Sequence, residues 1–205
     1  MNTARKLPAD YPSAVQIYLV LSQTGSLLSQ VLKIVTGAEY NHISISLSPE
    51  LARMYSFGRR HPYNPFWGGF VVESIHGGTF KRFTRTKAAV ISVPVSGEVY
   101  DGIRRTLERM LAEQTTYHYD FLGLLLAALH IHYRRNRRRY CSEFVKELLL
   151  NFHIKGVGQL PDIVQPVHFL ALPQGRLVFH GYLRDYPGKE AQVEEAQVEE
   201  ACSRP

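Results

Sequence analysis

Cysteine is scarce in this chain of 205 residues, which contains only Cys141 and Cys202. Two cysteines provide no disulfide framework, so we expect the protein to work in a reducing compartment such as the cytosol. The first ten residues lack the apolar core and the cleavage site of a signal peptide, which also favours a cytosolic protein over a secreted one.

Long apolar runs and metal-binding patterns are also missing. The longest apolar run, residues 121–131, is far shorter than the roughly 20 residues that a membrane-spanning helix needs. The sequence has no phosphate-binding loop, no paired catalytic carboxylates and no spacing of metal-ligating residues that is typical of a metal site. We therefore expect no metal ion and no organic cofactor.

The remaining composition predicts one folded domain. Hydrophobic residues make up 45% of the chain, and its length suits one core better than two. We expect the domain to cover residues 15–187, after an N-terminal extension over residues 1–14. Residues 188–205 repeat the sequence EAQVE, are acidic and lack aromatic residues, so we expect a disordered tail.

One of the two cysteines lies at the start of an apolar helical pattern. Phe144, Val145, Leu148 and Leu149 follow Cys141 at helical spacing, which predicts a helix over residues 141–150. The helix dipole favours the thiolate form of a thiol in the first turn, and a thiolate attacks carbonyl carbons. A free cysteine is more often a small buried apolar residue, so the catalytic interpretation requires a histidine elsewhere.

The candidate histidine lies in an alternating segment. Residues 41–47 alternate polar and apolar side chains, which predicts a strand with His42 and two serines on its polar face. Taken alone, one of nine histidines is more often structural than catalytic. Its position matters only in combination with Cys141.

Other patterns predict an antiparallel sheet with helices packed on it. Strands are expected over residues 15–21, 53–58, 70–75, 88–95 and 175–183. Helices are expected over residues 24–37, 96–111 and 121–129. Prolines and aromatic residues between positions 59 and 69 predict a surface loop, and Trp67 within it is a candidate wall of a substrate cleft.

The order of these pieces resembles a known family. His42 lies in YNHISI at residues 40–45, Cys141 lies in YCSEFV at residues 140–145, and a strand and a helix precede the histidine. In this order the chain resembles the circularly permuted papain-like cysteine hydrolases of the NlpC superfamily, whose relatives include the lecithin retinol acyltransferase group. The resemblance covers roughly residues 15–186. It implies an α+β fold of the permuted papain-like (NlpC) type, with a central antiparallel sheet and packed helices, among them the cysteine-bearing helix.

The resemblance also implies a third polar residue, on the strand after the histidine, that orients the imidazole. Here that position holds Ser56, which departs from the family's usual His, Asn, Gln or Glu. Glu73 on the following strand is the competing candidate, because a carboxylate stabilises an imidazolium better than a hydroxyl does. The alternative for Glu73 is a solvated strand residue, and the choice stays open.

The function implied is that of a thiol hydrolase or acyltransferase acting on an ester or amide. Cys141 would be the nucleophile and His42 the base, and the backbone N–H of Cys141, between Tyr140 and Ser142, would help to hold the oxyanion. A cell-wall peptide suits the superfamily at large, but the missing signal peptide argues against that location. The apolar segment 121–131 and the arginines after it slightly favour a lipid or acyl substrate over a peptide.

The positive charge of the chain supports a second interpretation. The net charge is +6, the pI is about 9.4, and five arginines, Arg137 and Arg138 among them, lie between positions 134 and 139. Such a run binds nucleic acid, binds an anionic membrane surface, which would make the protein peripheral to the membrane, or is a solvated face. The rival class is a non-enzymatic basic module in which Cys141 is incidental. Nucleic acid is disfavoured as its partner because no aromatic platform for base stacking accompanies the arginines.

Overall fold

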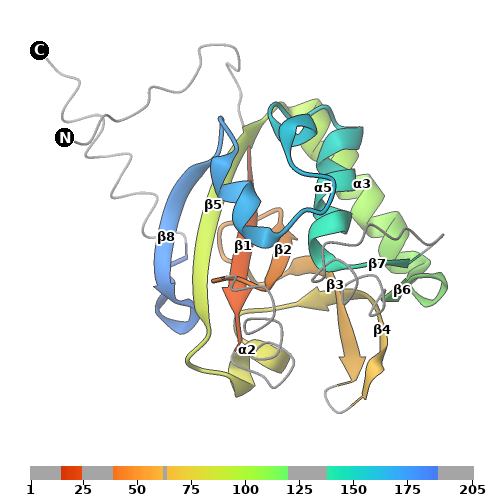
Figure 1. Ribbon diagram of the computed structural model, residues 1–205, viewed down its shortest axis with the longest axis vertical. Helices are drawn as coiled ribbons and strands as arrows, with labels where there is room; N and C mark the ends of the chain where they lie inside the picture. The colour runs from red at the N-terminus through yellow and green to blue at the C-terminus, as the bar shows by residue number, and fades with distance from the viewer. Residues whose placement is uncertain (1–14, 25–38, 62–63, 120–137, 189–205) are drawn as a thin grey trace, which may run out of the picture.

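The computed structural model describes residues 15–24, 39–61, 64–119 and 138–188 (Figure 1). The strands are β1 (Val15–Gln23), β2 (His42–Ser46), β3 (Met54–His61), β4 (Asn64–Glu73), β5 (Lys87–Val95), β6 (His118–Tyr119), β7 (Arg138–Arg139) and β8 (Arg176–Tyr182). The helices are α2 (Gly78–Arg82), α3 (Gly97–Ala112) and α5 (Cys141–Asn151), with short 3-10 turns η1 (Gln114–Thr116), η2 (Val157–Gln159), η3 (Pro166–Ala171) and η4 (Leu183–Asp185).

Six strands form one antiparallel sheet in the order β4-β3-β2-β1-β5-β8. In its centre, Leu19 of β1 lies opposite Ile45 of β2 on one side and Ile91 of β5 on the other. The central strands are rich in β-branched and aromatic residues, which pack well on a pleated surface. The protein therefore has an α+β fold with an antiparallel sheet, as predicted at this level.

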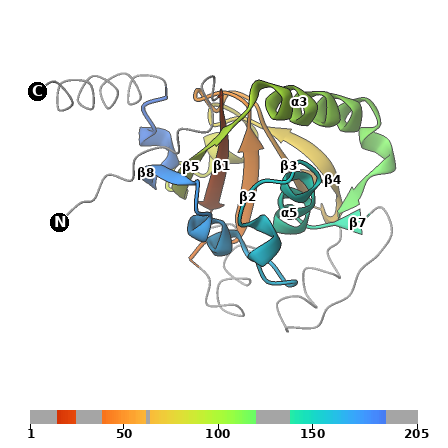
Figure 2. The same ribbon diagram turned by 90° about the horizontal axis from the view of Figure 1, so that it is seen from above.

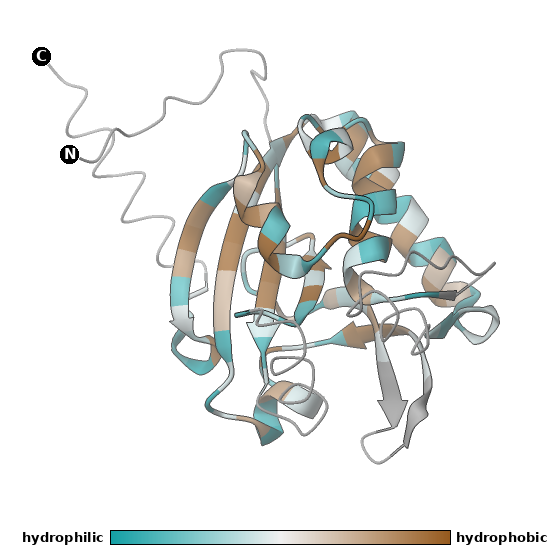
Figure 3. Ribbon diagram, viewed as in Figure 1, coloured by the Kyte–Doolittle hydropathy of each residue, from teal (hydrophilic) through white to brown (hydrophobic). Residues whose placement is uncertain are grey.

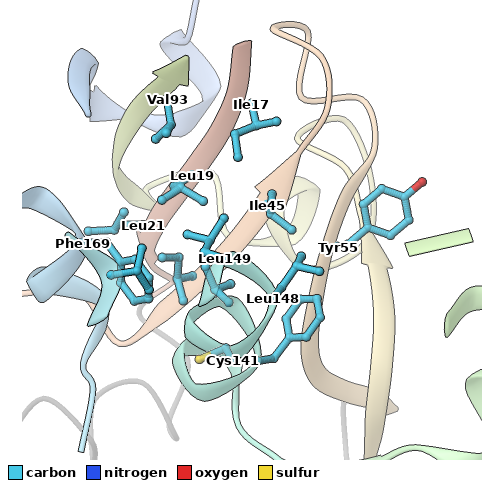
Figure 4. Close-up of a cluster of buried hydrophobic side chains, with 14 of the residues drawn as sticks. Ile17, Leu19, Leu21, Ile45, Tyr55, Val93, Cys141, Leu148, Leu149 and Phe169 are labelled. Atoms are coloured by element: carbon cyan, nitrogen blue, oxygen red, sulfur yellow. The ribbon is translucent and has the colours of Figure 1, made fainter. Parts of the chain in front are cut away.

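Both faces of the sheet are covered by apolar side chains. Ile17 and Leu19 of β1 belong to the larger core cluster together with Leu148 and Leu149 of α5 (Figure 4). This cluster also includes residues of α3. Tyr18 and Val20, which alternate with Ile17 and Leu19, belong to a smaller cluster with Phe80 of α2 and Leu183 of η4. Hydrophobic residues accordingly run along β5 as well as β1 (Figure 3). The sheet is a middle layer with a core on each side.

Two helices cover the larger core. The Ser96 side chain caps α3 by accepting a hydrogen bond from the Val99 N–H at 3.2 Å, and this helix buries Ile103 and Leu107. Helix α5 packs on β2 and β3, as Figure 2 shows from above. This packing brings the start of α5 to the part of the sheet where β2 begins.

The prediction of a loop between positions 59 and 69 is wrong. Strand β3 continues to His61, and β4 already begins at Asn64 and runs through Trp67 to Glu73. The prolines and aromatic residues suggested a loop, but β4 is an edge strand, and an edge strand tolerates proline because one side of its backbone needs no partner in the sheet. The two predicted strands are thus parts of one long hairpin.

Several predictions concern residues outside the described ranges. They are the N-terminal extension, the helices over residues 24–37 and 121–129, most of the arginine run and the acidic tail. Among the described residues, no helix combines the length and the apolar character that crossing a membrane would require.

Candidate active site

Cys141 is the first residue of α5. Tyr140 before it is extended, with φ −103° and ψ 169°, and its side chain makes no capping hydrogen bond to the helix. The first intrahelical bond comes from the Phe144 N–H to the Tyr140 carbonyl, at 3.1 Å. The N–H groups at a helix N-terminus point out of the helix, and the N–H of Cys141 is the first of them in α5.

His42 is the first residue of β2 and lies opposite Ser22 of β1. Cys141 lies close enough to the imidazole to help raise the pKa of His42. The cysteine is 3% exposed, and the histidine side chain is 17% exposed. The structure thus brings together two residues that are 99 positions apart (141 − 42) in the sequence.

Glu73, the last residue of β4, binds the other side of the imidazole. Its Oε2 lies 2.9 Å from His42 Nε2, and its side chain is also 17% exposed. An ionised carboxylate only accepts hydrogen bonds, so Nε2 must carry a hydrogen and donate it to Oε2. The second ring nitrogen, Nδ1, is then the one left for the sulfur of Cys141.

A serine that the sequence interpretation did not single out also belongs to this group. Ser44 is fully buried in β2, and its hydroxyl donates to the same Glu73 Oε2 at 2.6 Å. Its oxygen lies 3.3 Å from His42 Nε2. The available signal was the strand alternation, which puts Ser44 on the same polar face as His42.

The charges of this group shift the pKa values of the pair in opposite directions. Burial lowers the pKa of His42, but the Glu73 carboxylate and the contact with Cys141 outweigh burial and raise that pKa well above 6.5. Burial raises the pKa of Glu73, but His42 and the Ser44 hydroxyl outweigh it and hold that pKa below 4.5. Both shifts favour the ionised forms, a carboxylate facing an imidazolium.

Ser56, the other candidate for orienting the imidazole, lies outside this network. It is fully buried, and its hydroxyl donates to the backbone oxygens of Ile43 at 2.7 Å and Phe57 at 3.4 Å. Because Ile45 pairs with Tyr55, counting along the strands puts Gly58 opposite His42. A Cβ on Gly58 would indeed lie 3.8 Å from His42 Cε1. Of the two candidates, only Glu73 contacts the ring.

Ser142 and Lys146 of α5 donate hydrogen bonds to the segment that follows the helix. The Ser142 hydroxyl is buried and donates to the Val164 carbonyl at 2.8 Å. Lys146, one turn further on, donates from Nζ to the carbonyls of Leu160 at 3.1 Å and Pro161 at 2.8 Å. These bonds tie the segment after α5 to the first two turns of the helix. The hydroxyl of Ser142 is therefore engaged away from the sulfur.

The backbone places two of the remaining candidates on strands. Trp67 lies within β4, Arg138 lies in the short strand β7, and Arg137 is outside the described residues. Within the described part of the chain, no three His, Cys, Asp or Glu side chains gather where a metal ion could be held.

Comparison of the chain with protein-family models, curated proteins and solved structures found no match.

Proposed function

We propose that this protein is a cysteine hydrolase or acyltransferase that forms an acyl-enzyme on Cys141. The observation that carries the proposal is the contact chain from the Cys141 thiol through the His42 imidazole to the Glu73 carboxylate. A nucleophile, a base and a group that orients the base are the parts that thiol catalysis needs.

In the first half of the reaction, the thiolate of Cys141 attacks the carbonyl carbon of an ester or amide. A carbon–sulfur bond forms, and the carbonyl oxygen becomes an oxyanion that the backbone N–H of Cys141 would stabilise. The imidazolium of His42 then gives its proton to the leaving oxygen or nitrogen as the old bond breaks. The product of this half is a thioester on Cys141 and a free alcohol or amine.

In the second half, His42 acts as a base. Neutral after the first step, it takes a proton from water or from an acceptor alcohol or amine, which attacks the thioester carbon. The carbon–sulfur bond breaks, Cys141 leaves as a thiolate, and the imidazolium is restored. Water as the acceptor makes the protein a hydrolase, and another nucleophile makes it an acyltransferase.

The fold type that we propose is the permuted papain-like one, in which the histidine strand precedes the cysteine helix. An antiparallel sheet with α5 packed on β2 and β3 supports this arrangement. For the substrate, the apolar segment 121–131 and the arginine run favour a lipid or acyl group at an anionic membrane surface over a peptide.

The test is to trap the acyl-enzyme. The full chain is mixed with a 4-nitrophenyl ester, the release of nitrophenol is followed, and the mass of the quenched protein is measured. We expect a burst of about one nitrophenol per chain and an acyl adduct on Cys141, and neither with Cys141→Ala. Equal nitrophenol release by wild type and Cys141→Ala, without an adduct, would contradict the proposal.

A further inference from the structure

Glu73 Oε2 accepts two hydrogen bonds from β2. One comes from His42 Nε2 at 2.9 Å and the other from the Ser44 hydroxyl at 2.6 Å. Both donors are within hydrogen-bond distance of a single oxygen atom, and Ser44 is fully buried. A bond of 2.6 Å to an ionised acceptor is in the range of charge-assisted hydrogen bonds.

The number of hydrogens decides what the serine does. A hydroxyl has one hydrogen, and the Ser44 hydroxyl donates it to Glu73. His42 Nε2 already carries a hydrogen, so the 3.3 Å contact between Ser44 and that nitrogen adds no donation from the serine to the ring. Ser44 therefore acts on the carboxylate and reaches the imidazole only through it.

We propose that Ser44 is a positioning residue of the site, which fixes the Glu73 carboxylate against His42 and thereby keeps the imidazole aligned with Cys141. This inference rests on the proposed function. Without the hydroxyl, Oε2 keeps one donor, and the carboxylate is freer to rotate about its last side-chain bond. A carboxylate that loses a hydrogen bond is also easier to protonate, which removes the charge that supports the imidazolium.

Among the described residues, no group other than His42 and Ser44 stabilises the Glu73 carboxylate. The groups that act on Glu73 are His42 and Ser44, both from β2, and those that act on His42 are Glu73 from β4 and Cys141 from α5. The strands on either side of β2 contribute no charge at this point, since β3 presents Gly58 and β1 presents Ser22 opposite His42. Removing the Ser44 hydroxyl should therefore act through Glu73.

The chain contains a matched control on the same strand. Ser46 is also fully buried in β2 and lies on the same face, but its hydroxyl lies within hydrogen-bond distance of the backbone oxygens of Ser48, at 2.8 Å, and Arg53, at 3.1 Å. Ser46→Ala removes a buried hydroxyl as Ser44→Ala does, without touching the carboxylate. A purely structural role for Ser44 would make the two variants behave alike.

The experiment measures the rate at which iodoacetamide alkylates Cys141 between pH 4 and 9, by mass spectrometry of the full chain. We expect Ser44→Ala to move the acid side of this profile up by about half a pH unit to one unit and to slow alkylation several-fold at pH 5. Ser44→Thr, which keeps a hydroxyl, should restore most of the wild-type profile. Ser46→Ala should keep the wild-type profile.

Two further variants separate the possible outcomes. In a Glu73→Gln background, which has no carboxylate to protonate, Ser44→Ala should no longer shift the profile. If Ser44→Ala leaves the wild-type profile in place while His42→Ala changes it, the inference about Ser44 is wrong and the proposed function stands. If His42→Ala also changes nothing, the proposed function fails, and the role of Ser44 fails with it. Should Ser44→Ala not fold, Ser44→Val, which lacks a hydroxyl, favours a strand and matches Ser44→Thr in shape, supplies the same comparison.

Discussion

The ion pair between His42 and Glu73 predicts a coupling energy with a defined pH dependence. At 2.9 Å, two unit charges attract by about 6 kcal/mol at an effective dielectric constant of 20 and by about 1.4 kcal/mol in bulk water. Because each side chain is 17% exposed, the true value should lie between these limits. We expect a double-mutant cycle with His42→Gln and Glu73→Gln to give a coupling of about 2 to 3 kcal/mol.

The sign of the pH dependence follows from the two pKa shifts. The pKa of His42 is raised, so its contribution to stability is complete below about pH 6.5 and is lost as the pH rises through the folded-state value. The pKa of Glu73 is lowered, so its contribution is complete above about pH 4.5 and is lost as the pH falls through the folded-state value. The coupling should therefore be largest between these two values.

The assay is urea unfolding of the four proteins at several pH values, with the free energy of unfolding obtained at each. The cycle at pH 5.5 should give the full coupling, and the cycle at pH 3 should give a clearly smaller one. A coupling near zero at pH 5.5, or one that stays constant from pH 3 to pH 9, would refute the ion pair as the link between β2 and β4.

Three other predictions concern packing, hydrogen bonding and charge. Gly68→Ala should destabilise the fold by about 2 kcal/mol or more, because a Cβ there would lie 2.6 Å from the Gly58 carbonyl oxygen and from Tyr119 Cβ. Gly97→Ala is the control and should cost little stability, because no atom lies within 4 Å of its new Cβ. Thermal unfolding of both variants checks this prediction. Ser142→Ala should lower the free energy of unfolding, measured in urea, by about 1 to 2 kcal/mol, because it removes the hydrogen-bond donor of the Val164 carbonyl. A loss as small as that caused by replacing an exposed serine would contradict this prediction. Neutralising the arginines at 134, 135, 137 and 138 should weaken salt-sensitive binding to anionic vesicles and leave small-ester turnover intact. Loss of turnover in a variant that still folds would assign the arginines to the active site.

The sequence predicted the parts of the fold where the pattern is local. The apolar spacing after Cys141 predicted α5, and the serine at position 96 marked the start of α3, because capping and helical periodicity act over a few residues. The edge strand β4 was missed over its first half, because proline and glycine signal loops unless the position at the edge of the sheet is known.

Residue types and their spacing predicted only part of the site. Alternation along β2 put His42 and Ser44 on one face, but it could not show that both would meet the same carboxylate. The choice between Ser56 and Glu73 depended on pairing across two strands and on the reach of a glutamate side chain. Such register and side-chain details are set by tertiary packing, which a single sequence does not display.

The central claim is that Cys141 and His42 form a reactive pair, and the alkylation of the two cysteines in one chain tests it most directly. Iodoacetamide is added to the 205-residue chain between pH 5 and 9, and the modification of Cys141 and Cys202 is followed separately by peptide mass spectrometry. Cys202 serves as the reference, and an ordinary thiol reacts about tenfold more slowly for each pH unit below its pKa of about 8.5. We predict that Cys141 is alkylated faster than Cys202 at neutral pH, and that His42→Ala removes this advantage. A Cys141 profile that parallels that of Cys202, unchanged by His42→Ala, would contradict the pair and leave the basic binding module as the better account.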